Sequence, residues 1–531
     1  MAAPDQEKRP TRPKPLDRDP APPPRETLAA VGGRVLDPAT AIPVNGVTPR
    51  PTVYVGPRLT VSKSVDLEAA LEVLRAVAGP LGWDVEPEPE EPHTRGLRFG
   101  VRRVRITVAS NRVTVAPDGW TLLQQTRAQL GVEAVRGVGL DHVVFTDPYD
   151  SSHPYDSSHP YDSSHPYDSS HPYDSSHPSG PGGARPVRTY AVAGSGGRQP
   201  IAYVGPAPRR TPDDRMRSRR PVVALLDTGC AAHPWLDAAV DTSVTLDGHP
   251  IGYDDAATHP ELRGDLVGDL DGVIDPLSGH GTFIAGLVHQ ACPDADILAW
   301  RVVPSAGPIV ESAWVTALAQ VAELSRRHHA GEPGGRAIDV LSMSIGYYHE
   351  TPQDALFDPT LLAILEDLAG RGTIVVCSAG NDATSRPAFP AAFAPWSDRA
   401  GPVPLDPARP PVVSVGALNP SGQSDALFSN TGPWVRAYVP GAAVMSTMPS
   451  FEGGLQSVAR TVVFDRVRTT IDPDDFRSGF GVWSGTSFAA PLLAGRLAQS
   501  LLDEPAALLA EESDPVERAW SVIERNTSIA R

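Results

Sequence analysis

The chain has 531 residues, enough for a large catalytic domain and smaller ones, and its 40% hydrophobic content is adequate for a packed core. Its formal net charge of −17 argues against nucleic acid as a partner, because phosphate contacts need a basic face. No apolar run is long enough to span a bilayer, and the polar start lacks the apolar core of a secretory signal. The three cysteines suit a reducing compartment better than a disulfide framework. We therefore expect a cytoplasmic protein.

The N-terminal third begins with a polar segment and continues with a small folded unit. Residues 1–30 are rich in proline and charge, and we expect them to be disordered. In residues 52–146, strand-like and helix-like patterns alternate, with strands near 58–63, 104–108 and 142–146 and helices over 67–78 and from an Asp118 cap to Leu130. The order βαββαβ predicts a small α+β domain of the ferredoxin-like type.

Residues 147–219 are predicted to be a linker that contains five tandem Pro-Tyr-Asp-Ser-Ser-His repeats over 148–177. In polyproline II conformation the five histidines would line one face, roughly 19 Å apart. That spacing is too long for neighbouring histidines to share one metal ion. We therefore interpret the repeat as a spacer.

From residue 220 to the C-terminus the pattern is that of an α/β domain. Continuous apolar runs, typical of strands buried on both faces, occur at 222–226, 297–303, 337–345, 373–379 and 412–417. Helical stretches intervene at 311–329 and 361–370. This alternation predicts a mostly parallel sheet flanked by helices, with a site at the carboxyl ends of its strands.

Four polar side chains occupy positions suited to chemistry in such a domain. Asp227 directly follows the first strand, although an isolated Asp-Thr-Gly is usually only a turn. His280 lies between two glycines at the start of a small-residue helix, and Asn381 follows a buried strand. Ser487 lies in Ser-Gly-Thr-Ser-Phe-Ala-Ala-Pro, where we expect it at a helix start and Pro491 in the first helical turn.

Together these residues resemble the subtilisin-like (S8) serine peptidases, which share the chain order Asp, His, Ser. Further similar motifs are Ser-Met-Ser-Ile-Gly at 342–346, Phe-Pro-Ala-Ala at 389–392, Phe-Ser-Asn-Thr-Gly at 428–432 and Val-Pro-Gly at 439–441. The resemblance covers about 221–502. It implies a catalytic triad of Asp227, His280 and Ser487, with Asn381 as the oxyanion donor.

The resemblance also implies a protein or peptide substrate that lies extended against the enzyme. The residues expected to bind it are Ser344, Ile345 and Gly346, which would pair with its backbone, and Ser378, Ala379 and Gly380, which would form a wall of the P1 pocket. Many relatives carry an N-terminal pro-domain of the βαββαβ kind, so we expect residues 52–146 to contact the catalytic domain. The alternative is an independent recognition module, because the linker that follows is long.

Two segments depart from the family pattern. The stretch 450–477 is an insertion whose alternating residues near 461–467 suggest a hairpin. The acidic run 254–275 precedes His280, and its carboxylates Asp265, Asp269, Asp271 and Asp275 fit no standard calcium loop. We expect a solvated loop there, with structural calcium as the alternative and no metal or other cofactor required for catalysis.

The function predicted from the sequence is a serine endopeptidase that works through an acyl-enzyme intermediate. The alternative is a catalytically inactive homologue that serves as a binding scaffold. An esterase is a weaker alternative, because the serine motif is not Gly-x-Ser-x-Gly.

Overall fold

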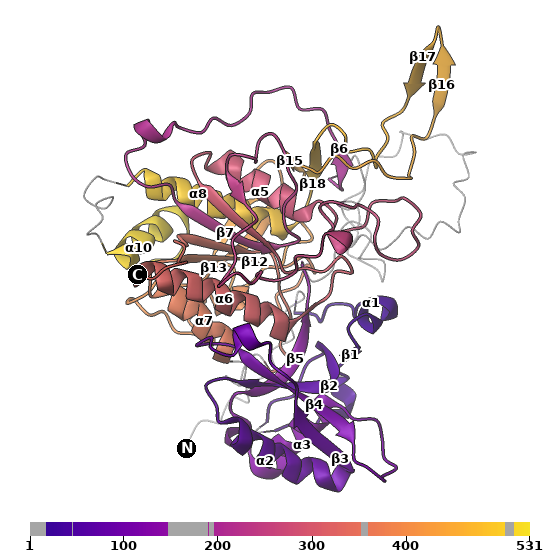
Figure 1. Ribbon diagram of the computed structural model, residues 1–531, viewed down its shortest axis with the longest axis vertical. Coiled ribbons are helices and arrows are strands. Elements are labelled where there is room, and N and C mark those ends of the chain that lie inside the picture. Colours follow the sequence, from indigo (N-terminus) through magenta and orange to yellow (C-terminus); the bar gives the residue numbers. More distant parts are fainter. Residues whose placement is uncertain (1–16, 45, 147–189, 191–195, 352–358, 505–513) are drawn as a thin grey trace, which may run out of the picture.

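The computed structural model describes residues 17–44, 46–146, 190, 196–351, 359–504 and 514–531 (Figure 1). The hexapeptide repeats and most of the predicted linker lie outside these residues. Within the described ranges, no helix combines the length and apolarity needed to cross a lipid bilayer. A smaller N-terminal domain lies at one end of the molecule, and a larger α/β domain forms the rest.

The N-terminal domain has the predicted βαββαβ order. Its elements are β2 (Val53–Ser62), α2 (Leu67–Ala78), β3 (Trp83–Pro87), β4 (Val101–Val108), α3 (Gly119–Leu130) and β5 (Val138–Val144). The strands pair antiparallel in the order β5-β2-β4-β3. Asp66 and Asp118 cap the two helices, each by accepting a backbone N–H three residues later, at 2.8 Å. Apolar residues from both helices and the sheet form one buried core.

Part of the segment before this domain is ordered, although its composition suggested disorder. Residues 17–30, which we expected to be disordered, include helix α1 (Arg25–Ala29), and β1 (Gly33–Val35) then pairs with β2. Leu28 is buried, and the carboxylates of Asp17 and Asp19 pair with Arg50. These tertiary contacts supply the order that local composition does not.

The α/β domain is built on a seven-stranded sheet in which every adjacent pair is parallel. In sheet order the strands are β14 (Ala437–Pro440), β13 (Val413–Leu418), β12 (Ile374–Ser378), β11 (Val340–Met343), β7 (Val222–Asp227), β9 (Asp296–Arg301) and β8 (Val240–Asp241). The mostly parallel sheet predicted from the apolar runs is thus confirmed.

Helices cover both faces of this sheet. Helices α5 (His280–Ala291), α8 (Thr486–Leu502) and α10 (Pro515–Asn526) pack on one face, and α6 (Glu311–His329) and α7 (Pro359–Ala369) pack on the other. Alternate residues of β7 enter opposite cores: Val223 and Leu225 face α5 and α8, whereas Ala224 and Leu226 face α6. Burial on both faces explains why the strand sequence is continuously apolar.

Smaller elements surround the main sheet. Strands β15 (Val444–Thr447), β18 (Phe480–Trp483) and β6 (Gln199–Pro200) form a three-stranded antiparallel sheet. The predicted insertion contains a hairpin, β16 (Arg460–Val463) and β17 (Arg466–Thr469), that projects from the body of the molecule (Figure 1). Short 3-10 helices lie at Pro38–Thr40, Gly79–Leu81, Pro92–Thr94, Val132–Val135, Asp213–Arg215, Ala256–Thr258 and Ala391–Phe393.

The two domains share backbone hydrogen bonds. Strand β10 (Ile309–Val310) of the α/β domain pairs antiparallel with β5 and so extends the N-terminal sheet. Phe145, the residue after β5, exchanges two backbone hydrogen bonds with Gly346, at 3.0 and 2.8 Å. The N-terminal domain therefore contacts the α/β domain beside the segment predicted to bind substrate.

Candidate active site

The predicted acid and base lie side by side. Asp227 ends β7, His280 begins α5, and His280 Nδ1 lies 2.7 Å from Asp227 Oδ1. Both side chains are buried. The close approach of α5 depends on glycine, because a Cβ at Gly281 would overlap the carbonyl oxygen of Gly229. The glycine after the histidine thus lets the helix bring the imidazole to the strand end.

The predicted nucleophile reaches the same place from a third element. Ser487 is the second residue of α8 and is fully buried. The ring of the next residue, Phe488, lies 5.2 Å from the His280 ring, measured between centroids. Among the described residues, the Ser487 Oγ has no hydrogen-bond partner. Catalytic hydrogen bonds are often long or badly aligned without substrate, so this state does not disqualify the residue.

Pro491 lies inside α8 rather than in its first turn, because the helix begins at Thr486. A proline has no N–H, so it cannot donate to the carbonyl four residues earlier, which belongs to Ser487. The Ser344 Oγ donates to that carbonyl instead, at 2.9 Å. The proline and the serine on the neighbouring segment together set the backbone of the candidate nucleophile.

Asn381 follows β12 and faces the start of α8. Its Oδ1 accepts a hydrogen bond from the Thr486 N–H at 2.9 Å, and the Gly380 N–H donates to Thr486 Oγ1 at 3.0 Å. Because the amide oxygen takes this bond, the Nδ2 of Asn381 lies on the opposite branch of the planar amide. The side chain of Asn381 is thus held against the start of α8, one residue before Ser487.

The six residues predicted to bind substrate lie at the ends of two central strands. Ser344, Ile345 and Gly346 follow β11, and Ser378, Ala379 and Gly380 end or follow β12. The backbone of Gly346 is able to pair with an extended chain, since it already does so with Phe145. The structure thus gathers all the predicted site residues at the carboxyl edge of the sheet.

Two residues that tie the site together were not found from the sequence. Arg198 donates hydrogen bonds of 2.8 to 3.2 Å to carbonyls of the loop before His280, namely those of Ile274, Asp275, Pro276 and Ser278. Its guanidinium also lies 5.0 Å from the centre of the Trp483 ring, which packs against His280. Glu261 is buried beside Asp227 and the start of α5. Both stand in segments without periodicity, so no local pattern pointed to them.

The acidic loop is less solvated than expected. Asp269 and Asp271 are exposed, but Asp275 is buried and its Oδ2 accepts the N–H groups of Leu266 and Val267. Asp265 Oδ2 accepts the N–H of Gly272 at 2.5 Å. Two of the four carboxylates therefore fold the loop rather than face solvent, because buried backbone donors need acceptors.

The described residues contain one cluster with three potential metal-ligand atoms within 4.8 Å, formed by His142, His349 and Glu350. It lies between the domains, away from Ser487. His142 Nδ1 lies 2.6 Å from Glu311 and its Nε2 lies 2.9 Å from Glu350, while His349 Nδ1 accepts the Thr351 N–H at 3.1 Å. These ring nitrogens are engaged in hydrogen bonds, so the cluster is better described as an ionic network than as a metal centre.

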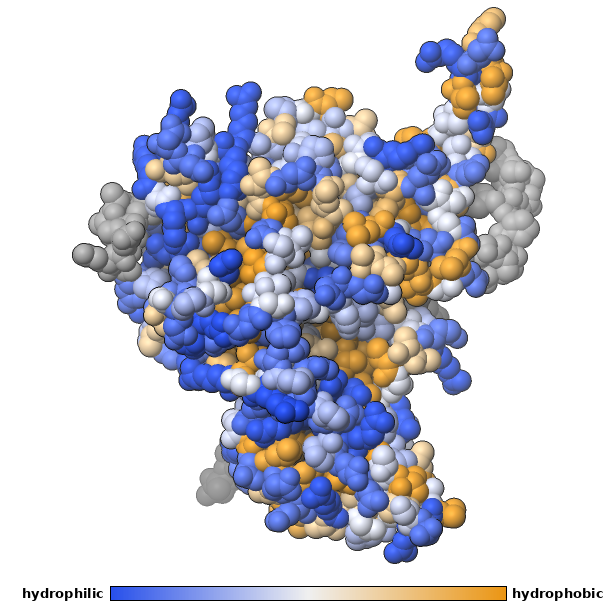
Figure 2. All heavy atoms as spheres, viewed as in Figure 1, coloured by the Kyte–Doolittle hydropathy of each residue, from blue (hydrophilic) through white to orange (hydrophobic). Residues whose placement is uncertain are grey.

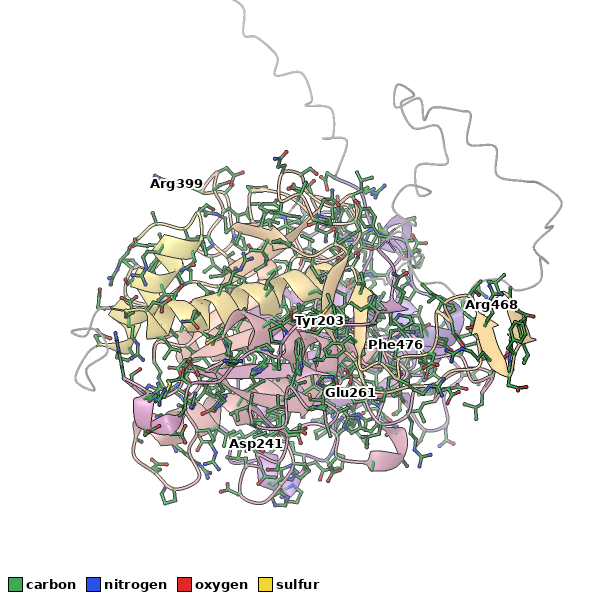
Figure 3. All side chains as sticks on the ribbon, turned by 90° about the horizontal axis from the view of Figure 1, so that it is seen from above. Tyr203, Asp241, Glu261, Arg399, Arg468 and Phe476 are labelled. Atoms are coloured by element: carbon green, nitrogen blue, oxygen red, sulfur yellow. The ribbon has the colours of Figure 1, made fainter. Side chains whose placement is uncertain are left out.

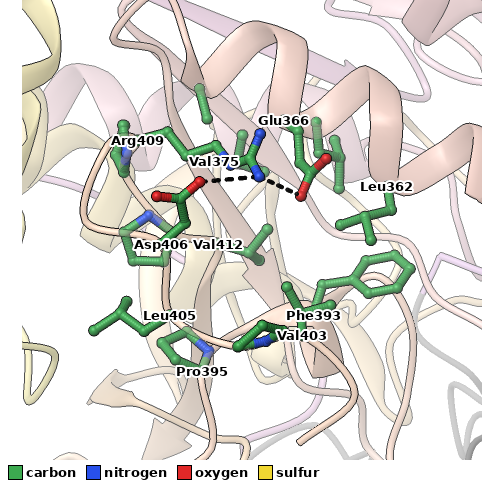
Figure 4. A pocket seen from close by; sticks show the side chains of 15 residues that line it. Leu362, Glu366, Val375, Phe393, Pro395, Val403, Leu405, Asp406, Arg409 and Val412 are labelled. Atoms are coloured by element: carbon green, nitrogen blue, oxygen red, sulfur yellow. Dashed lines mark ion pairs between the residues drawn. The ribbon is translucent and has the colours of Figure 1, made fainter. Parts of the chain in front are cut away.

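A hollow beside α7 is also separate from the candidate active site. Its lining includes Leu362, Phe393 and Val412, and Arg409 pairs there with Asp406 and Glu366 at 3.1 Å each (Figure 4). None of the predicted site residues lines it.

Comparison with known proteins identifies the family. The family model described as "Subtilase family" (Peptidase_S8) matches residues 218–520. The major intracellular serine protease of Bacillus subtilis is 24% identical over 299 residues, which are 52% of this chain and 66% of that protein. The intracellular serine protease of Paenibacillus polymyxa is 26% identical over 295 residues, which are 54% of this chain and 68% of that protein.

Among solved structures, a cold-adapted subtilisin-like serine proteinase matches at 18% identity and a TM-score of 0.35, over 59% of this chain and 86% of that chain. The matches to the two intracellular proteases cover about two thirds of the length of each of those proteins. Because the family model covers more than half of the residues, the chain belongs to the subtilase family of serine peptidases.

Proposed function

We propose that this protein is a serine endopeptidase in which Asp227, His280 and Ser487 form the catalytic triad. The observation that carries the proposal is the 2.7 Å contact between Asp227 and His280 beside the start of α8, where Ser487 stands. The membership of the chain in a peptidase family supports the same assignment.

In the proposed mechanism, His280 takes the proton of the Ser487 hydroxyl as its oxygen attacks the peptide carbonyl. Asp227 holds the imidazole by Nδ1 and stabilises the imidazolium that forms. The Asn381 Nδ2 and the Ser487 backbone N–H donate to the tetrahedral oxyanion. His280 then protonates the leaving amine, and water releases the acyl-enzyme.

The N-terminal domain is proposed to restrict substrate access. The Gly346 backbone already donates to and accepts from Phe145, and an extended substrate would use the same two groups. A substrate therefore competes with the segment that follows β5. The hexapeptide repeats after this segment are proposed to be a spacer.

A fluorophosphonate probe tests the catalytic assignment. We expect the wild-type protein to be labelled and the Ser487→Ala variant to remain unlabelled, with a loss of kcat on the order of 10⁶-fold, the size of the effect in subtilisin. Ser500→Ala, on the same helix but at its far end, is the matched control and should be labelled like the wild type. Absence of labelling in a folded wild-type protein would instead favour the inactive scaffold.

A further inference from the structure

A second buried carboxylate stands beside the candidate triad. Glu261 is only 1% exposed and lies inside the α/β domain (Figure 3). The Oε1 of Glu261 accepts from the Thr228 hydroxyl at 2.5 Å and from the Gly281 N–H at 3.1 Å. Its Oε2 accepts from the Thr282 hydroxyl at 2.5 Å and from the Thr282 N–H at 3.3 Å.

These four bonds connect the two halves of the acid–base pair. Thr228 follows Asp227, and its hydroxyl lies 3.1 Å from Asp227 Oδ1 as well as 2.5 Å from Glu261. Gly281 and Thr282 follow His280 in the first turn of α5. A single carboxylate thus holds the residue after the acid and the two residues after the base.

A cap for α5 accounts for only part of this arrangement. A carboxylate at a helix N-terminus satisfies backbone donors and favours the helix dipole. The hydroxyl of Thr228, just after β7, accepts the Gly281 N–H at 2.7 Å and donates to Glu261, so Thr228 and Glu261 together join the strand end that carries Asp227 to the helix start that carries His280. The fixed anion is also bonded to the residues that follow Asp227 and His280, inside a buried site where charges interact strongly.

We propose that Glu261 is a positioning residue for catalysis: it fixes His280 relative to Asp227 and adds a negative charge that stabilises the His280 imidazolium. The inference rests on the proposed peptidase function. Burial raises the pKa of Glu261 to about 6, so the side chain is ionised at pH 8, where its effect is best measured.

The test replaces Glu261 by glutamine, which has the same shape but no charge and one acceptor fewer. On a small peptide substrate we expect kcat to fall about 10- to 100-fold with little change in KM, since misplacement of the base affects the chemical step. The acid-side pKa in the pH profile of kcat/KM should also fall, because an imidazolium that loses a nearby anion gives up its proton more readily.

Glu504→Gln is the matched control, because Glu504 is also buried and charged but pairs with Arg525 near the C-terminus. We expect Glu504→Gln to lower Tm without changing the acid-side pKa in the pH profile of kcat/KM. If Glu261→Gln behaves in the same way, with wild-type kcat, the positioning role is wrong. Should Glu261→Gln fail to fold, Thr228→Val removes the Thr228 bond to Glu261 together with the contacts of that hydroxyl to Asp227 and to the Gly281 N–H, and should also lower kcat.

A measurement that needs no activity separates this proposal from the proposed function. In the Ser487→Ala background, NMR of ¹⁵N-labelled histidine gives the pKa of His280 before and after the Glu261→Gln change, which should lower it. An unchanged His280 pKa would overturn the positioning role even if the enzyme is active. A wild type that the fluorophosphonate does not label, together with a shifted His280 pKa, would overturn the peptidase function alone.

Discussion

At the residue scale, Pro491 and Ser344 act on one carbonyl group. Ser344→Ala should leave the buried carbonyl of Ser487 without its donor and cost roughly 1–3 kcal/mol of stability. In the double variant Ser344→Ala/Pro491→Ala, the new N–H at 491 is able to donate to that carbonyl, so part of the loss should be recovered. Denaturant unfolding of the four proteins gives the coupling energy, and strictly additive changes would contradict this account.

Some residues of the candidate site could be predicted from the sequence, and others could not. The positions of Asp227, His280 and Ser487 were predictable because each stands where a strand ends or a helix begins, within two residues of a glycine. Glu261 and Arg198 were not, because their roles depend on where two irregular segments run in three dimensions. Local pattern predicts groups attached to regular elements and misses groups that connect them.

At the scale of elements, the predictions succeeded where a strand or helix is defined by its own residues. The helix over Leu67–Ala78 shows its apolar face in the sequence, and the structure has the same bounds. The order of residues 17–30 was missed because it comes from contacts with distant residues, such as the ion pair of Asp19 with Arg386. Contacts between segments that are far apart in the sequence cannot be read from the local sequence pattern.

The hairpin of β16 and β17 buries none of its strand side chains, so we expect it to contribute little to the stability of the protein. All eight of its strand residues are exposed, and Phe464 in the turn between the strands is 94% exposed. The hairpin projects from the surface and carries both hydrophobic and hydrophilic residues (Figure 2). Replacing residues 458–471 by a short Gly-Ser linker removes no buried side chain and leaves buried Asp474 in place. We expect Tm to change by no more than about 2 °C and kcat/KM on a small peptide to be unchanged.

Thermal unfolding and kinetics on a peptide of a few residues provide the measurement. The informative control is Asp474→Ala, which removes the acceptor of the Ile274 and Leu455 N–H groups and should lower Tm. A large fall in Tm on deletion of the hairpin would show that it stabilises the body after all.

At the scale of the whole molecule, the two domains meet around one buried histidine. His142 of β5 lies between Glu311 at the start of α6 and Glu350 after β11, and the Tyr347 ring stacks on it at 4.7 Å. His349 lies beside it, and Arg127 of α3 lies 3.7 Å from Glu350. Asp141, the preceding residue, accepts bonds from Ser312 and pairs with Arg58.

We expect this network to make the contact between the domains dependent on pH. Burial opposes the charge of His142, but the attraction and hydrogen bonds of Glu311 and Glu350 outweigh it and raise the pKa of His142 to about 10. When the domains separate, the pKa returns to about 6.5. The stabilising contribution is therefore complete below pH 6.5 and is lost progressively as the pH rises toward 10.

Between pH 7 and 9 the free energy of opening at this interface should fall by up to about 1.4 kcal/mol per pH unit. The neighbouring shifts lie below this window, since burial raises the pKa of Asp141 only to about 6 and lowers that of His349 to about 4. Hydrogen exchange of peptides from 138–144 in full-length Ser487→Ala, corrected for the intrinsic rate at each pH, measures the effect. His142→Gln should lower protection at pH 7 and remove the slope, whereas His328→Gln, at an exposed histidine near the end of α6, should retain it. A wild-type protein whose corrected protection does not decrease between pH 7 and 9 would show that His142 does not hold its proton at the interface.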